Sequence, residues 1–332
     1  MSLDIILKII LGFIISFLIT IYLVPLIIDV AFRLKILDNP DGNLKNHKKP
    51  TPYLGGLAVY VGFITSLSLV FPFENSLFLF ILGSTLLLFV GLIDDLIAMK
   101  PYQKFFGQMV ATFCFLKAGL HLKENFFSYY PNIIISFFWI LSVINALNLV
   151  DVMDGLAATL AICASFTFLI ITIIFKIYSV AIMLAAFIGS MLGFFIFNKP
   201  DAKIYLGDAG SLFIGGILAT IPFMIPWGSY NYYGYLTPII ILLIPLLEVG
   251  TLILVRSYKR IPFYKGSPDH FCIYLQNNGF SKLEILIYVS ILSAALFLIS
   301  VPFSLNLLSI FVVIPVFICL LILWYSMFFF KK

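Results

Sequence analysis

The sequence predicts an all-α fold, a polytopic membrane bundle of about eleven transmembrane helices. Three observations support this prediction. Hydrophobic residues make up 62% of the 332 residues and only 11% are charged, whereas a soluble domain is about 25% charged. The apolar residues form runs of roughly 20, the length that a helix needs to cross the hydrocarbon core of a bilayer. Most charged residues lie between these runs.

The apolar runs define eleven candidate spans in chain order. They lie near residues 5–30, 54–72, 77–93, 105–120, 131–147, 156–175, 177–197, 208–226, 236–255, 284–303 and 307–329. The first run has no basic stretch before it and no small-residue cleavage site after it. We therefore expect a retained helix and not a signal peptide. No linker divides the chain, so the sequence predicts a single membrane-embedded catalytic domain over residues 1–332.

Lysine and arginine are distributed unevenly between the two sets of loops. The loops after odd-numbered spans and the C-terminus carry 16 of the 20 basic residues, and the other side carries the remaining 4. Because basic residues concentrate on the cytoplasmic side of membrane proteins, we expect the odd loops to be cytoplasmic. These loops lie near residues 31–53, 94–104, 148–155, 198–207 and 256–283.

Aspartates gather in the same five loops, although the rule that orients basic residues makes no demand on acidic ones. Asp94 and Asp95 directly follow an apolar run. Two adjacent carboxylates at the end of a membrane span repel each other and are costly without a cation. Carboxylates and lysines at one membrane surface therefore indicate a charged ligand there. Ordinary solvated loops are the alternative interpretation.

Four motifs on this face carry the residue types of phosphoryl-transfer chemistry. Asp94 and Asp95 offer hard oxygen ligands or a base beside a metal ion. A stripe at three-residue steps runs along one helical face and ends before a glycine: Asn145, Asn148, Asp151 and Asp154. The segment from Gly207 to Ser211 opens the eighth span, where a helix N-terminus favours a phosphate. His47, Lys48 and Lys49 precede the second span. Carboxylates, Mg²⁺ and lysine together are typical of enzymes that transfer phosphoryl groups.

With these motifs the chain resembles the polyprenyl-phosphate N-acetylhexosamine-1-phosphate transferase superfamily, glycosyltransferase family 4. The resemblance covers essentially the whole chain, and matching motifs occur in every predicted cytoplasmic loop. They are Asp38-x-Pro40 with Lys45, His47, Pro50, Pro52 and Gly55-Gly56; Asp94-Asp95 with Lys104 and Gln108; Asn145-Ala146-x-Asn148-x-x-Asp151-x-x-Asp154-Gly155; Asn198 and Pro200 through Gly207-Asp208-x-Gly210-Ser211; and Arg256 with the loop to Gly279.

The resemblance implies Mg²⁺-dependent transfer of a sugar 1-phosphate from a UDP-sugar to polyprenyl phosphate, with release of UMP; Mn²⁺ is the alternative ion. It implies catalytic roles for Asp94, Asp95, Asp151 and Asp154, and metal binding by Asp208 and Asp95. It implies substrate contacts from Lys45, His47, Lys104, Asn145, Asn148, Asn198, Arg256, Asp269 and His270. The enzyme would lie in a bacterial inner membrane, face the cytoplasm, contact membrane lipids and bind no nucleic acid. A homodimer stays open.

The fifth loop, residues 256–283, departs from the family pattern. Family members commonly carry a His-x-His or triple-histidine cluster there, whereas this loop has only His270. This difference argues against the phospho-MurNAc-pentapeptide translocase and favours a UDP-N-acetylhexosamine donor. Val152 and Leu44 replace a usual glycine and arginine, and Glu248 stands where an aspartate is frequent. For Glu248, pairing with Arg256 and catalysis are both open.

Three other functions are alternatives to this transferase. One is the pentapeptide translocase itself, another is a non-catalytic relative of the same fold, and the third is a membrane transporter. A transporter is expected to place ionisable groups near the bilayer midplane, often between repeated halves. Here they lie at one surface and the sequence has no internal repeat, so an enzyme that meets a soluble nucleotide and a lipid is favoured.

Overall fold

The computed structural model describes residues 2–38, 50–71, 75–123, 128–262 and 267–326. The described part is almost entirely helical, as the composition predicts. Its one sheet joins two short antiparallel strands, β1 (Leu37–Asp38) and β2 (Thr51–Pro52). The α-helices follow in chain order, with short 3-10 turns between α8 and α9. They are α1 (Leu3–Leu34), α2 (Gly55–Val70), α3 (Asn75–Ile97), α4 (Pro101–Lys117), α5 (Tyr129–Val150), α6 (Leu156–Ile174), α7 (Tyr178–Asn198), α8 (Gly207–Thr220), α9 (Thr237–Ile241), α10 (Leu243–Tyr258), α11 (Phe271–Asn277), α12 (Lys282–Ser304) and α13 (Ile310–Ser326).

Each predicted span contains a helix, but not every helix is long and apolar enough to cross a membrane. Within the described residues seven qualify, and an eighth does if α9 and α10, which meet at a bend of 69°, form one span. The apolar helices α2 and α13 are shorter. Helix α4 begins with polar residues and is not among the candidates. A multi-pass membrane protein is therefore confirmed, and the number eleven stays a prediction.

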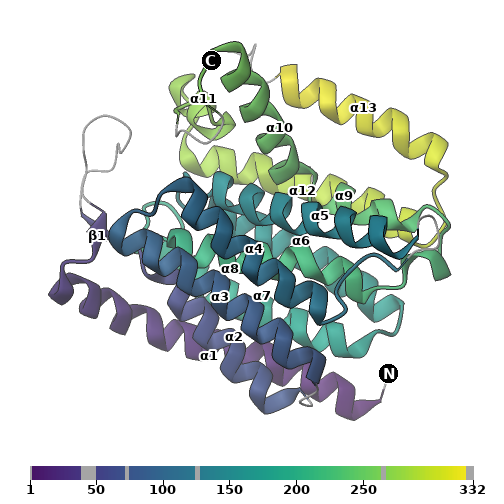
Figure 1. Cartoon of the computed structure of the whole chain (residues 1–332), viewed down its shortest axis with the longest axis horizontal. Coiled ribbons are helices and arrows are strands. Elements are labelled where there is room, and N and C mark those ends of the chain that lie inside the picture. The colour runs from purple at the N-terminus through teal and green to yellow at the C-terminus, as the bar shows by residue number, and fades with distance from the viewer. Residues whose placement is uncertain (1, 39–49, 72–74, 124–127, 263–266, 327–332) are drawn as a thin grey trace.

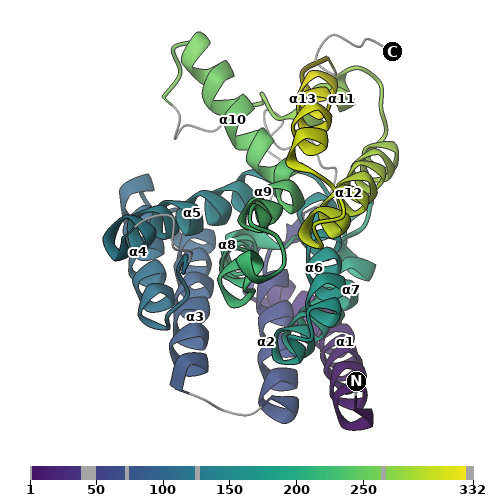
Figure 2. The same ribbon diagram turned by 90° about the vertical axis from the view of Figure 1, so that its right-hand side faces the viewer.

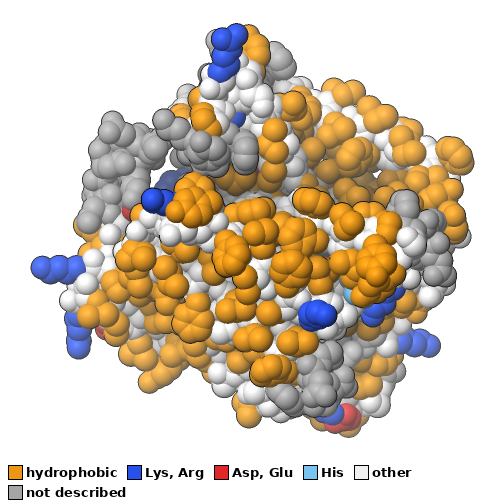
Figure 3. All heavy atoms as spheres, viewed as in Figure 1, with side chains coloured by type: hydrophobic (Ala, Val, Ile, Leu, Met, Phe, Trp, Pro, Cys, Tyr) orange, Lys and Arg blue, Asp and Glu red, His pale blue; other side chains and the backbone are white. Residues whose placement is uncertain are grey.

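Helix α8 occupies the centre of the bundle. It packs against α3 and α5 on one side and against α2 and α6 on the other (Figure 2). Its residues from Ala209 to Thr220 are all buried. The outer helices instead expose large apolar side chains such as Leu18, Tyr22 and Phe311. Hydrophobic side chains cover much of the face in Figure 3, which is the surface expected where lipid is the solvent.

Glycines let the helix backbones touch at the start of α8. A Cβ at Gly91 of α3 would collide with the carbonyl group of Asp208, and one at Gly56 of α2 would collide with the backbone of Gly210. Gly207 has φ +73°, and a Cβ there would meet the carbonyl oxygen of Tyr53 and the carboxylate of Asp95. The start of α8 is therefore fixed between the ends of α2 and α3 by backbone contact.

The chain before α2 is hydrogen-bonded to the chain before α8. Tyr205 N donates to Pro52 O over 2.7 Å, Gly55 N donates to Tyr205 O over 3.0 Å, and Gly56 N donates to Leu206 O over 2.8 Å. The described end of the first predicted loop thus lies directly beside the turn that carries Asp208.

Helices α10, α11 and α13 form a second part of the molecule. They lie above the main bundle in both ribbon views (Figures 1 and 2), and α10 packs directly against α5 of the bundle. The bend between α9 and α10 directs α10 away from α8. The fifth loop, which joins α10 to α12 through α11, therefore belongs to this upper part.

Candidate active site at the start of α8

The ammonium group of Lys104 connects two carboxylates that lie far apart in the sequence. Its Nζ lies 2.9 Å from Asp94 Oδ2 and 2.6 Å from Asp208 Oδ2. The three side chains come from the end of α3, the start of α4 and the start of α8. Burial alone would lower the pKa of Lys104, but the attraction of Asp208 and Asp94 outweighs it and raises this pKa. Lys104 is therefore a firmly held cation.

Asn148, in the last turn of α5, completes this cluster. Its Nδ2 donates to Asp208 Oδ1 over 2.6 Å and to Ser211 Oγ over 2.8 Å. Its Oδ1 accepts from Lys104 Nζ over 3.2 Å. One side-chain amide thus ties the end of α5 to both the lysine and the aspartate. We refer to Asp94, Asp95, Lys104, Asn148 and Asp208 as the α8 cluster.

Asp94 and Asp95 are adjacent in the sequence, but their carboxylates accept hydrogen bonds from different segments of the backbone. Asp95 accepts the backbone N–H groups of Asp208 and Ala209 at 2.9 and 3.0 Å, so its carboxylate caps α8 and interacts with the positive end of the helix dipole. Asp94 accepts Met99 N over 2.7 Å just after α3 and keeps Oδ2 for Lys104. The predicted metal role of Asp95 thus falls on a carboxylate that already holds two amides.

Asp151 and Asp154 follow the end of α5. Asp151 is half-buried, and its carboxylate has no hydrogen-bond or ion-pair partner among the described residues. Burial, together with the charges of Asp208, Asp95 and Asp154, raises its pKa well above the usual range. Asp154 is buried and accepts from Lys282 Nζ over 2.7 Å and from Ala202 N over 3.2 Å. It joins the third, fourth and fifth loops.

The donor chemistry of this site suits Mg²⁺. Aspartate, asparagine and serine oxygens are the ligand types that this ion prefers, and they converge here around Asp208. Within the described ranges, however, no three His, Cys, Asp or Glu residues surround one point as a metal site would. The cation between Asp94 and Asp208 is the Lys104 ammonium. A bound Mg²⁺ would require Lys104 to yield one of these carboxylates, or would use the free carboxylate of Asp151.

The fifth loop carries a separate polar cluster. Arg256 Nε donates to Ser267 Oγ over 3.0 Å, and Lys259 Nζ lies 2.5 Å from Asp269 Oδ1. Burial alone would raise the pKa of Asp269, but its bonds to Lys259 and Ser267 lower it. His270 is buried, and its Nδ1 lies 3.0 Å from Glu248 Oε1. The structure thus gives Glu248 a hydrogen bond to His270, where the sequence left a pairing with Arg256 open.

Two of the predicted substrate-binding amides serve packing in this structure. Asn145 exchanges hydrogen bonds with the side chain of Gln108, with its own Nδ2 donating over 2.9 Å. Asn198 is buried, accepts Gly155 N over 3.1 Å and donates to Ile204 O over 2.9 Å. It thereby braces the third loop against the fourth. Contacts from either amide to a substrate stay predictions.

The other predicted residues are also placed. Arg256, Asp269 and His270 lie in the fifth-loop cluster and not with Asp208, while Lys45 and His47 lie outside the described residues. Sequence reasoning gave no role to Lys282, which pairs with Asp154 across 128 positions. Its only local signal is its position at the start of α12, after the capping serine Ser281.

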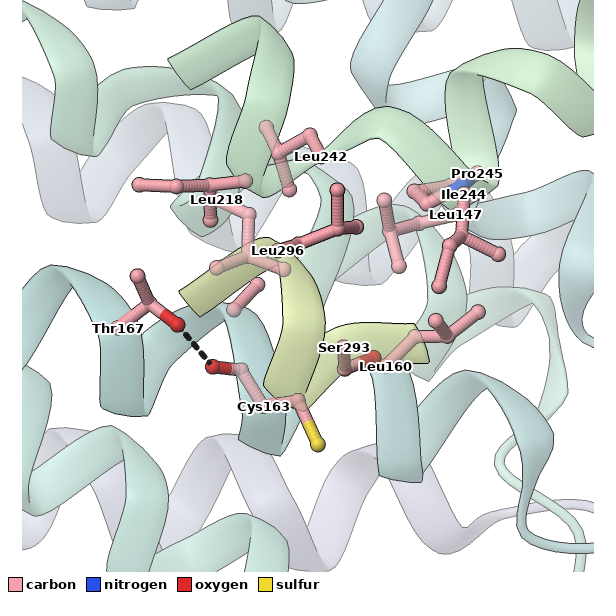
Figure 4. Close-up of a pocket in the computed structure, with 12 residues that line it drawn as sticks. Leu147, Leu160, Cys163, Thr167, Leu218, Leu242, Ile244, Pro245, Ser293 and Leu296 are labelled. Atoms are coloured by element: carbon pink, nitrogen blue, oxygen red, sulfur yellow. Dashed lines mark hydrogen bonds between the residues drawn. The ribbon is translucent and has the colours of Figure 1, made fainter. Parts of the chain in front are cut away.

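Two cavities in the described part lie away from these residues. One is a void of about 10 Å³ beside the bend between α9 and α10, lined mostly by apolar side chains and by Cys163, Thr167 and Ser293 (Figure 4). The other, of about 620 Å³, is lined by residues 121–123 and 222–229 and by Tyr232, beyond the far end of α8. Neither contains a candidate site residue, so we locate the site by its charged side chains and not by a cavity.

The chain is similar to known proteins over much of its length. Residues 77–225, which span α3 to the end of α8, match the model of glycosyl transferase family 4. The chain is 28% identical over 260 residues to the "probable undecaprenyl-phosphate N-acetylglucosaminyl 1-phosphate transferase" of Bacillus subtilis (strain 168), covering 74% of this chain and 71% of the relative.

Two further relatives are named phospho-N-acetylmuramoyl-pentapeptide-transferase. The one from Bacillus cytotoxicus is 32% identical over 238 residues, covering 62% of this chain and 72% of the relative. The one from Enterococcus hirae is 31% identical over 254 residues, covering 68% and 76%.

Proposed function

Because the chain belongs to glycosyl transferase family 4, we propose that this membrane phosphoglycosyltransferase transfers an N-acetylhexosamine 1-phosphate from a UDP-sugar to polyprenyl phosphate. An oxygen of the lipid phosphate attacks the phosphorus that carries the sugar. The bond from this phosphorus to the bridging oxygen breaks, and UMP leaves with that oxygen. The product is a polyprenyl diphospho-sugar, the first lipid-linked unit of a cell-envelope glycan.

One observation carries the proposal: Lys104 Nζ lies between Asp94 and Asp208 at the start of α8, with Asn148 on the same aspartate. Phosphoryl transfer needs cations and oriented donors around the phosphate oxygens, and carboxylates that hold a metal ion. The α8 cluster offers both at the ends of apolar helices, where a lipid phosphate and a soluble nucleotide can meet. We place this end at the cytoplasmic surface of a bacterial inner membrane, from the distribution of basic residues.

The residues divide the work by their surroundings. Asp208 would hold Mg²⁺, with Asp94 or the unpaired Asp151 as a second carboxylate, and the ion would neutralise charge on the phosphates. Lys104 would hold a phosphate oxygen once it releases a carboxylate. Asp95 caps α8 and keeps Asp208 in place. Asp154 and Lys282 join the end of the fifth loop to the third loop, which also carries Asp151.

For the donor we propose a UDP-N-acetylhexosamine. The fifth loop has a single histidine, His270, and its ring is buried against Glu248. A histidine held in this way does not offer the group of imidazoles found in relatives with a His-x-His or triple-histidine motif. The UDP-MurNAc-pentapeptide is the second candidate donor, favoured by the relatives named pentapeptide transferases.

The test is turnover by the purified full-length chain in detergent with undecaprenyl phosphate. UDP-GlcNAc, UDP-GalNAc and UDP-MurNAc-pentapeptide are compared at equal concentration, and both UMP and the lipid product are measured. We expect turnover with a UDP-N-acetylhexosamine, its loss in EDTA and its recovery with Mg²⁺. Preference for the pentapeptide donor would support the second candidate. No lipid product with any donor would contradict the proposal.

A further inference from the structure

A buried pair of ionisable side chains joins α10 to the start of α11. Glu248 is 1% exposed and His270 is 5% exposed. His270 Nδ1 lies 3.0 Å from Glu248 Oε1, and Phe271 N donates to the same oxygen over 3.3 Å. When Nδ1 carries its hydrogen, two neighbouring donors of the α11 segment converge on one carboxylate oxygen of α10.

The second oxygen of the Glu248 carboxylate makes loss of the pair more costly. Glu248 Oε2 is buried and has no hydrogen-bond partner within the described residues. His270 and the Phe271 amide are thus the donors that Glu248 has in the described part of the chain. A buried charge that loses its partner is strongly destabilising, because water cannot replace the lost bond. Burial of the Glu248 carboxylate therefore strongly favours the conformation in which α11 packs on α10 and supplies these two donors.

Helix α13 packs against the same junction between α10 and α11. The ring of Phe271 packs against Trp324 of α13, with 4.8 Å between the ring centroids. Trp324 Nε1 donates to Thr251 Oγ1 over 3.0 Å, and Thr251 lies on α10, three residues after Glu248. Helices α10, α11 and α13 thus meet around one small buried centre.

This joint carries the polar end of the fifth loop. Ser267 and Asp269 shortly precede His270; they bind Arg256, in the last turn of α10, and Lys259, directly after α10. Arg256 and Ser267 are buried, whereas the side chain of Lys259 is 50% exposed, so a water-soluble nucleotide can reach this end of the loop at Lys259. If α11 left its seat, Asp269 and Ser267 would move with it, while the α8 cluster would keep its own contacts.

We propose that Glu248 and His270 are positioning residues whose buried pair seats residues 267–277 on α10 and so fixes the loop groups that bind the nucleotide sugar. The inference rests on the proposed function, because it assigns this loop to the donor. His270 acts through Glu248 and does not itself contact the donor. Loss of the pair therefore weakens donor binding and leaves the chemical step and acceptor binding in place.

The kinetic test compares two substitutions of the same residue. His270→Leu removes the donor to Glu248, whereas the side-chain amide of His270→Asn can occupy the place of Nδ1. We expect His270→Leu to raise KM for UDP-N-acetylhexosamine at least tenfold, with kcat and KM for undecaprenyl phosphate within threefold of wild type. His270→Asn should restore KM to within threefold. Asn277→Ala, an exposed change on the same helix, is the control. If His270→Asn is as impaired as His270→Leu, the imidazole contacts the donor itself and the proposal is overturned.

Amide hydrogen exchange tests the joint without relying on activity. In the full-length chain, residues 267–277 should exchange at least tenfold faster in Glu248→Leu and His270→Leu than in wild type. Exchange in α8 should not change. The milder Glu248→Gln serves if Glu248→Leu does not fold. Unchanged exchange in a folded His270→Leu variant overturns the proposal. If wild type turns over no UDP-sugar, the proposed function fails, while the exchange result still decides whether the pair seats the segment.

Discussion

The α8 cluster and the fifth-loop cluster are both polar groups beside apolar helices, but they are built differently. The α8 cluster is carried on the ends of four helices, and glycines allow the backbones of α2 and α3 to touch the start of α8. The fifth-loop cluster is carried on a short segment that side-chain hydrogen bonds and the backbone N–H of Phe271 hold to α10. The first arrangement suits groups that must keep their spacing through a reaction. The second suits groups that bind a variable part of a substrate.

The largest expected effect is that of removing a carboxylate from the rigid cluster. Asp208→Asn keeps the shape of the side chain but removes the charge that Lys104 contacts and that Mg²⁺ would need. We expect kcat to fall by roughly 10³-fold, measured as UMP release at saturating Mg²⁺ in a variant whose folding is checked by its Tm. Asp29→Asn, at an exposed position near the end of α1, is the control. Near-normal activity of Asp208→Asn would remove Asp208 from the reaction.

Loss of the central cation should come next. Lys104→Met keeps much of the apolar stem and removes the ammonium that lies between Asp94 and Asp208. We expect a fall of about 10²-fold in kcat/KM, since one charged donor to a phosphate is lost. Lys100→Met, four residues earlier and exposed, should retain activity. Equal effects of the two substitutions would mean that position in the cluster does not matter.

The backbone contact between α2 and α8 can be tested without changing a charged residue. Gly56→Ala adds a Cβ that collides with Gly210, so α2 and α8 must separate. Overpacking of this kind costs about 1–3 kcal/mol, and we expect a lower Tm and about a tenfold loss of kcat. Gly250→Ala is a matched control, because its Cβ would meet no heavy atom within 4 Å. If both variants behave like wild type, the packing of α2 on α8 does not set the site.

The ion pair between the third loop and the start of α12 should give a smaller effect. Lys282→Met breaks the ion pair with Asp154, whose lysine is 34% exposed. Because water compensates a partly exposed pair, we expect about a threefold rise in KM for the donor and little change in kcat. Lys8→Met, which breaks an exposed pair with Asp4, should change neither constant. A large fall in kcat for Lys282→Met would move this lysine into the chemical step.

The smallest expected effect is a gain in stability. Burial and the charges of Asp208, Asp95 and Asp154 raise the pKa of Asp151, so ionisation is less favourable in the folded protein than in the unfolded chain. Folding therefore becomes less favourable as pH rises from the unfolded pKa through the raised one. In EDTA at pH 8 we expect Asp151→Asn to raise Tm by about 2–4 °C and to reduce activity. The gain should shrink towards pH 4, and a gain independent of pH would contradict the electrostatic cause.

The sequence was a good guide to the rigid cluster and a poor one to the loop. Adjacent acids after an apolar run and a Gly-Asp turn follow local rules, so the approach of Asp94 and Asp95 to the start of α8 could be predicted. The predicted helical stripe is wrong for Asp151 and Asp154, because α5 ends at Val150 and both residues lie in the turn that follows. The different hydrogen-bond partners of Asp94 and Asp95 could not be predicted, because they depend on which backbone segment each carboxylate faces. The same holds for Asn198, whose partners lie in two different loops.

The remaining differences also have physical causes. The pairs Glu248–His270 and Asp154–Lys282 join residues 22 and 128 positions apart, and only tertiary packing decides them. Counting apolar residues could not reveal that the ninth predicted span is bent by 69° or that α4 begins with polar side chains. The predicted roles of Lys45 and His47 lie outside the described residues.

The glycine contacts around α8 also bear on how such an enzyme can diverge. Because Gly56, Gly91 and Gly210 leave no room for larger side chains, a substitution there disturbs several catalytic groups at once and is readily lost to selection. Residues 267–277 contain no glycine. If this segment binds the donor as proposed, new donor preferences can arise by gradual change at its exposed positions, while the α8 cluster is inherited as a unit.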